Sequence, residues 1–180
     1  MYQKVYAEEL GLGGSADLSP LPVSISITRD ATNATFTLSG PSSVWFGVGF
    51  DAKVMSDAPY AIIVDGNGEV QERRLASHAP GNALPSSVEV LSTSVKDGVR
   101  TVVLQRTAMG QTTQHWSVPS HAGSVNIISA VGNTVALAFH KQQQGSSILL
   151  LPTKQPTCVC TPSESTFINY MNVIRIILCH

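Results

Sequence analysis

Two side chains that can ligate a metal ion stand out because of their immediate surroundings, Met55 and His140. Met55 follows the glycine-containing run VWFGVGF and is flanked by Ser56 and Asp57, whereas a methionine that fills a core gap usually has apolar neighbours. His140 ends the apolar run VALAFH before a polar turn, where a histidine is most often a satisfied surface residue. A thioether and an imidazole can together hold haem iron with six ligands, which favours electron transfer over oxygen chemistry. The two residues can meet only if the fold brings their loops together, because they lie far apart in the sequence.

The other chemistry-bearing residues form no recognisable catalytic motif. The spacing of His115 and His121 does not match a zinc-ligand pattern, and no cysteine lies near them. Asp51, Asp57 and Asp65 are too scattered to predict an acid–base pair. The sequence contains no G-x-S-x-G elbow, no P-loop and no dinucleotide-binding glycine motif. We therefore predict that the chain has no catalytic residues and is not an enzyme by itself.

The composition indicates one globular domain with few charges. The chain has 180 residues, of which 43% are hydrophobic and only 13% charged, and its formal net charge is -1. This composition is unlike that of disordered chains, which are rich in charge and poor in apolar residues. A protein that binds a phosphate backbone would show a basic face, so we expect no nucleic-acid partner. The length fits a single domain that can bury a sizeable core.

Short β-like runs separated by turn residues make up most of the chain. Apolar and polar residues alternate with a period of two, and Asp97-Gly98 between two such runs is a strong hairpin signal. No convincing helical periodicity precedes the tail. The pattern predicts an all-β antiparallel sandwich of about ten or eleven strands. The expected strands cover residues 23–29, 34–38, 44–50, 60–65, 69–75, 88–96, 99–106, 115–118, 125–131, 135–140 and 147–151.

Two stretches, VWFGVGFDAKVMSDAPYAIIV and ISAVGNTVALAFHK, resemble the DOMON family, particularly its haem-binding cytochrome domains from extracellular oxidoreductases. The region between them is similar to the family as it occurs in algal and other protist proteins, and the likeness covers about residues 21–151. It implies a single immunoglobulin-like β-sandwich that binds haem b through Met55 and His140 as axial ligands. Around that haem we expect Val44, Phe46, Val48, Phe50 and Phe139.

The resemblance implies a module for electron transfer or redox sensing, at most the electron-transfer domain of a larger oxidoreductase. The expected partner is a redox protein, a fused oxidoreductase or a membrane cytochrome domain, and the expected location is extracellular or membrane-associated. The alternative is a DOMON module without haem that binds a carbohydrate or another ligand, or serves adhesion. A third reading is a structural domain of a larger protein.

Both ends of the chain depart from the family pattern. We expect a weakly ordered lead-in over residues 1–20, the sandwich over residues 21–151, and a linker with an atypical, short helical or disordered tail over residues 152–180. No signal peptide or membrane-spanning segment is visible. We expect a truncated start and a spurious end, the alternative being a genuine short cytosolic form. The tail contains three cysteines, Cys158, Cys160 and Cys179. Cys179 can form a disulfide with Cys158 or Cys160, or all three can remain free thiols.

Overall fold

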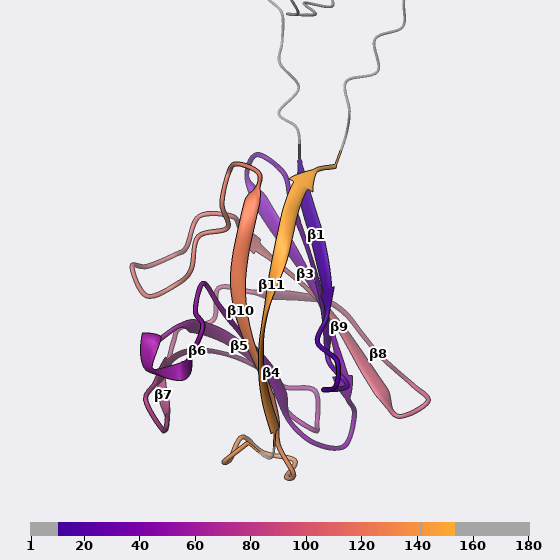
Figure 1. The fold of residues 1–180 in the computed structure, drawn as a ribbon. Helices are drawn as coiled ribbons and strands as arrows, with labels where there is room; N and C mark the ends of the chain where they lie inside the picture. Colours follow the sequence, from indigo (N-terminus) through magenta and orange to yellow (C-terminus); the bar gives the residue numbers. More distant parts are fainter. Residues whose placement is uncertain (1–10, 141, 154–180) are drawn as a thin grey trace, which may run out of the picture.

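The computed structural model describes residues 11–140 and 142–153 (Figure 1). The expected tail and its three cysteines lie outside these residues. Eleven strands and one 3₁₀ turn, η1, make up the described fold, and no helix in it is long and apolar enough to cross a membrane. The elements are β1 Leu12–Asp17, β2 Ser24–Arg29, β3 Asn33–Pro41, β4 Phe46–Phe50, η1 Met55–Asp57, β5 Tyr60–Val64, β6 Val70–Ala76, β7 Ala79–Ala83, β8 Glu89–Lys96, β9 Val99–Thr107, β10 Gly123–Val131 and β11 Gln142–Pro152.

All strands form one antiparallel sheet in the order β7-β6-β5-β4-β10-β11-β1-β2-β3-β9-β8. The sheet curls so that the half containing β4 and β5 faces the half containing β3 and β9 (Figure 1). The long strand β11 joins the halves, because it pairs with β10 over most of its length and with β1 at its end. Gly11 and Thr153 lie side by side there, and the Thr153 amide donates to the Gly11 carbonyl at 2.7 Å. The prediction of an all-β antiparallel sandwich is confirmed.

Alternating side chains fill the space between the two halves. β3 and β10 bury every second residue, as expected for strands with one face on a core. β4 and β5 are buried at every position, because segments outside the sheet cover their second face. Aromatic rings from opposite halves meet in the core, where the Phe36 and Phe50 rings lie edge to face at 5.7 Å. The largest fully buried side chains are Tyr60, Phe36, Phe46, Phe50, Leu18, Ile25, Ile27, Leu38, Ile62, Leu104, Ile127 and Ile148.

Five segments differ from the sequence prediction. Residues 12–17 form β1 although a weakly ordered lead-in was expected there, and residues 79–83 form β7 within an expected loop. Glycine and proline obscured both strands, since these residues are unfavourable in strand interiors. The expected strands 115–118 and 135–140 are irregular. Residues 142–147, part of a polar run that was expected as a turn, are instead the start of β11, because pairing with β10 overrides their composition.

The contact between β1 and β11 leaves no room for a side chain at Gly14. A Cβ atom built at Gly14 would lie 2.3 Å from the Leu149 carbonyl oxygen, which is backbone and cannot rotate away. We expect Gly14→Ala to lower the free energy of unfolding by about 2 kcal/mol, the usual cost of overpacking. Urea denaturation measures the change, with Gly123→Ala as the matched control, because nothing lies within 4 Å of a Cβ at Gly123. Equal stability of the two variants would contradict the prediction.

Candidate functional site

The outer face of β4, the face turned away from the core, is lined with very small residues. Gly47 and Gly49 occupy its two outward positions, and their register partners on β5 and β10 include Ala61 and Ala130. Gly145 of β11 lies on the same face, because it pairs with Ile128, which pairs with Gly49. Over these residues lie the side chains of Ile63 and Ile128: Ile63 Cδ1 would clash with a Cβ atom built at Gly47, and Ile128 Cγ1 lies 2.9 Å from one built at Gly49. The glycines therefore let these two isoleucine side chains lie directly against the backbone of β4.

The Met55 turn lies over one end of this face. Asp57 folds the turn, because its carboxylate accepts the backbone amides of Lys53 at 2.9 Å and Val54 at 3.2 Å. The turn closes at Ala58, which adopts a left-handed conformation with φ of 50°. The Lys53 carbonyl comes within 3.8 Å of a Cβ built at Gly145, which places the turn above β11. Met55 itself is half-buried.

The segment 132–140 lies over the other end of the face. Backbone hydrogen bonds hold it there: the Trp45 amide donates to Thr134 at 3.0 Å, and the Gly66 amide donates to Val135 at 2.8 Å. Leu137 packs against a small cluster on the outer face that Trp45, Ala61 and Ile63 form. The two predicted ligand segments thus approach one face from opposite ends of β4, a placement that sequence spacing could not show.

His140 is half-buried and lies at the end of this segment, two positions before Gln142, the first residue of β11. Its ring stacks on the Phe139 ring, with centroids 4.7 Å apart and planes inclined by 24°. Phe139 is 80% exposed, which is unusual for so large an apolar side chain. Among the described residues, no hydrogen-bond partner holds the His140 imidazole. Its nitrogens are therefore not committed within this part of the chain.

The other expected site residues lie on the opposite side of β4. Phe46, Val48 and Phe50 point into the core between the two halves, and Val44 packs against that core. The reason is the strand period of two: when the glycines take the outward positions, the large residues between them must point inward. These side chains support the strand from beneath and do not line its outer face.

The sequence analysis missed a buried polar network at the open side of the sandwich. Glu72 is 3% exposed, and its carboxylate accepts the Tyr60 hydroxyl at 2.5 Å, the Ser87 hydroxyl at 2.6 Å and the Val88 amide at 3.1 Å. The Ser87 amide donates to the same carboxylate. The His115 imidazole lies 3.8 Å from it and donates through Nε2 to the Pro85 carbonyl. No local pattern in EVQERRL marked Glu72 as buried.

These contacts set the ionisation of the network. Burial on its own would raise the pKa of Glu72, but hydrogen bonds from Ser87, Tyr60 and Val88 outweigh it and hold that pKa below its ordinary value. Burial raises the pKa of Tyr60 well above its ordinary value, so its hydroxyl stays protonated and donates to Glu72. Arg106 lies over the Tyr60 ring at 5.3 Å and adds a buried positive charge. The network therefore joins β5, β6, β9 and the segment before β8.

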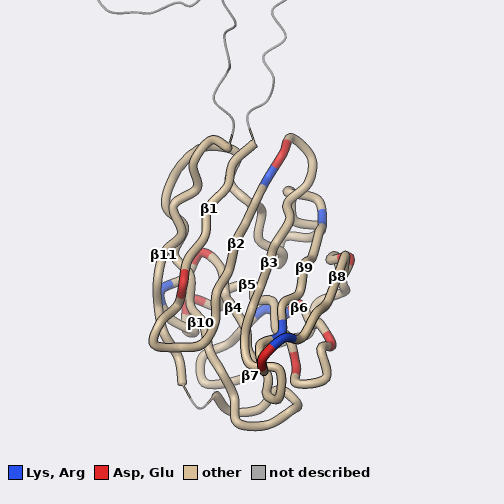
Figure 2. Tube along the Cα trace, turned by 90° about the vertical axis from the view of Figure 1, so that its right-hand side faces the viewer, with Lys and Arg blue, Asp and Glu red and all other residues tan. Residues whose placement is uncertain are grey.

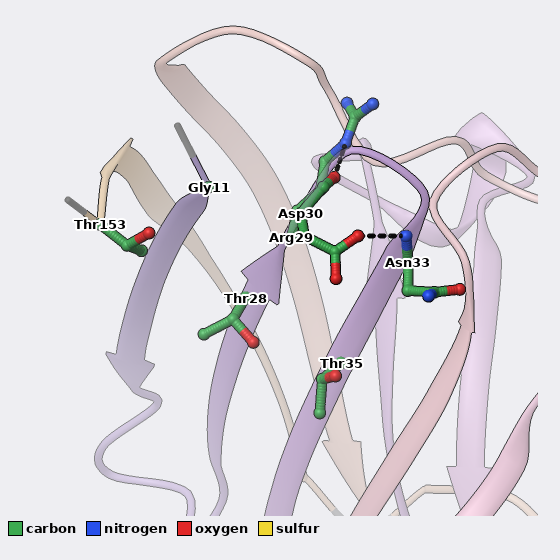
Figure 3. Close-up of a pocket in the computed structure, with 7 residues that line it drawn as sticks. All are labelled: Gly11, Thr28, Arg29, Asp30, Asn33, Thr35 and Thr153. Carbon is green, nitrogen blue, oxygen red and sulfur yellow. Dashed lines mark hydrogen bonds between the residues drawn. The ribbon is translucent and has the colours of Figure 1, made fainter. Parts of the chain in front are cut away.

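Met55 and His140 are not among the residues that line two clefts on the described surface. One of about 240 Å³ lies beside the network and is lined by Phe50, Asp51, Asp57, Pro59, Tyr60, Arg74, Thr113, His115, Trp116 and Ser117. The other, of about 230 Å³, lies where the described ends of the chain meet (Figure 3). There Asp30 accepts the Asn33 amide at 2.7 Å, and backbone amides hold the pKa of Asp30 below its ordinary value. That carboxylate serves the turn, because its described contacts are local.

The donor types on these two segments suit one type of metal centre. Among the described residues, no three His, Cys, Asp or Glu side chains gather closely enough to hold a bare metal ion. A thioether and an imidazole instead match an iron whose other ligands come from a porphyrin. Exposed apolar side chains accompany both donors, Val54 beside Met55 at 52% and Phe139 beside His140 at 80%. Ile63 and Ile128 fill the space over the small residues, so what suits a haem here is the pair of donor types and the apolar character of their neighbours.

Comparisons with known proteins place the fold among cytochrome domains. The cytochrome b domain of pyranose dehydrogenase from Coprinopsis cinerea superposes with a TM-score of 0.54 at 17% identity, covering 71% of this chain and 76% of that one. The cytochrome domain of cellobiose dehydrogenase from Myriococcum thermophilum superposes with a TM-score of 0.55 at 15% identity, covering 75% and 80%. No family model and no curated protein matches the sequence. The chain therefore has the β-sandwich fold of these cytochrome domains.

Proposed function

We propose that this protein is a DOMON-type haem b module that transfers or senses electrons, with Met55 and His140 as the two axial ligands. The observation that carries the proposal is the placement of both residues on segments over one face of β4, one from each end. The likeness in fold to two cytochrome domains supports it.

The outer face would hold the haem through apolar contacts. Trp45, Ile63 and Leu137 form the apolar surroundings at the His140 end, and Ile128 does so at the Met55 end. Phe139 is the exposed ring that such a ligand would cover. When bound, the haem supplies a one-electron redox centre, and thioether ligation together with burial raises its reduction potential. The chain's own residues bind, orient and shield the group, and they perform no further chemistry in this proposal.

The proposed partner is an oxidoreductase, either fused to this module or separate, because both similar structures are domains of dehydrogenases. The proposed location outside the cytoplasm follows from the family resemblance. The few charged residues are scattered over the fold with both signs interspersed (Figure 2). Contact with a partner would therefore depend more on apolar side chains near the haem than on long-range steering.

Titration of the purified full chain with haemin tests the proposal. We expect stoichiometric binding, and after reduction a sharp spectrum of six-coordinate, low-spin haem. Resonance Raman and electron paramagnetic resonance spectra would identify thioether and imidazole ligation. A chain that leaves the haemin spectrum unchanged would exclude the proposal and would favour the ligand-binding module without haem.

A further inference from the structure

Among the described residues, no strand pairs with the outer edge of β8, the last strand of the sheet. In the sheet order it pairs with β9 alone, and all eight of its residues are exposed. Figure 1 shows β8 at the margin of the fold, where the β8–β9 hairpin extends away from the other strands. In an antiparallel strand every second residue turns its backbone groups away from a given neighbour, so β8 presents an unused row of donors and acceptors.

The same hairpin exposes a concentration of large apolar side chains. Val90 and Leu91 are each 48% exposed, Val95 is 54% exposed, and Val99 across the turn is 45% exposed. Single exposed apolar residues are ordinary, but Val90 and Val95 share one face of β8 beside its outer edge, where another strand can pack against them. The opposite edge of the sheet differs, because β7 is only five residues long and contains Pro80 and Gly81. Those two residues protect β7 from pairing, whereas β8 contains no proline.

The sequence of β8 is complementary to itself once its bulge is taken into account. Its register with β9 shifts between Val90 and Ser92, so Leu91 is the extra residue of a β-bulge. Around a two-fold axis at Thr93, an antiparallel copy that skips Leu91 would place Val90 opposite Val95 and Glu89 opposite Lys96. The two side chains of each pair then lie on the same face of the joint sheet. If Leu91 were counted as a paired residue, the residues before it would meet side chains of the opposite face.

We propose that β8 pairs with β8 of a second copy of this chain, giving a two-fold symmetric dimer with one continuous sheet. The interface contains two pairs of opposite charges, Glu89 with Lys96 from each side, and two valine pairs. The self-complementary charges favour a second copy over an unrelated strand, because every residue of a two-fold interface must satisfy its own symmetry partner. The interface lies away from the outer face of β4, so it does not depend on haem binding.

Sedimentation velocity of the full chain over a concentration series tests the dimer. We expect the sedimentation coefficient to rise from the monomer to the dimer value below about 0.5 mM, the range in which small interfaces associate. Glu89→Lys sets like charges opposite each other twice and should weaken the dimer about tenfold. The double variant Glu89→Lys/Lys96→Glu restores opposite charges and should restore the dimer. Glu69→Lys, an equal charge reversal on an exposed residue of the β5–β6 turn, is the matched control.

A second measurement locates the interface independently of charge. Because the axis passes through Thr93, Thr93→Cys should yield a disulfide-linked dimer under mild oxidation, beyond the background that the parent chain gives through its own cysteines. A parent chain that stays monomeric over the whole series would overturn the proposal. A dimer that is insensitive to Glu89→Lys and does not cross-link through position 93 would overturn it as well, because its interface would lie elsewhere.

Discussion

Replacing His140 by alanine should reduce haemin affinity more than tenfold, and replacing Met55 by leucine should convert the bound haem from low-spin to high-spin. The two effects differ because imidazole is the stronger ligand and forms most of the bond to the iron, whereas loss of the thioether leaves a five-coordinate centre. Substituting a residue that only hydrogen-bonds to a metal ligand already lowers metal affinity about ten- to a hundredfold. Removing a ligand itself should therefore lower haemin affinity at least as much. Absorbance titration and electron paramagnetic resonance measure both changes.

Two matched substitutions separate ligation from general damage. His121→Ala removes an exposed histidine of another segment, and Met109→Leu changes a methionine that is 71% exposed. Both should leave the haem spectrum unchanged. Met55→Leu should also lower the reduction potential, because thioether ligation raises it, while the unfolding midpoint of the haem-free chain stays constant. If Met55→Leu and His140→Ala bind haemin with the parent spectrum, the ligand assignment is wrong even where haem binding itself is real.

Replacing Glu72 by alanine should lower the free energy of unfolding by about 3 to 5 kcal/mol, the usual cost of removing one member of a buried charged network. The carboxylate receives hydrogen bonds from Tyr60, Ser87 and Val88, and its loss leaves these donors buried without an acceptor. Chemical denaturation measures the loss, and Glu69→Ala, at an exposed position, should change stability by less than about 0.5 kcal/mol.

The same network predicts how stability depends on pH. The pKa of Glu72 is lower in the folded state than in the unfolded state, so the unfolded chain binds the proton first as the pH falls. The stability that Glu72 contributes is therefore complete above its unfolded pKa of about 4.3 and is lost as the pH falls through the folded value. Glu72→Gln cannot titrate, so its stability should decline less steeply in acid. If the free energy of unfolding of Glu72→Gln and of the parent chain fell equally steeply in acid, a group other than Glu72 would dominate the pH dependence.

The parts of the fold that local pattern predicts are the strands with a clear period of two. β3 and β10 follow their alternating sequences closely, and the Asp97-Gly98 turn joins β8 to β9 as expected, with both residues at positive φ. β11 shows the limit of such reasoning. Its first half is the polar run QQQGSS, and only nine register pairs with β10 explain why it is a strand.

The candidate site shows the same division. Residue type and flanking sequence marked Met55 and His140 only as possible ligands, and the family resemblance made them the leading haem pair. The face that their segments share follows from the pairing of β4 with β10 and of β10 with β11. The inward direction of Phe46 and Phe50 follows from the pleat once Gly47 and Gly49 take the outer positions. Glu72, Ser87 and His115 come together only through tertiary contacts, which no short sequence motif contains.

The contact between Gly11 and Thr153 has a consequence for how this fold can be rearranged. Because the first and last described residues are hydrogen-bonded neighbours, a short peptide could join them without stretching any strand. A circular permutant could then be opened at an exposed loop, such as the one around Gln111, with the strand order of the sheet unchanged. For the same reason residues 11–153 could be inserted into a surface loop of a host protein, because the two points of attachment would lie next to each other.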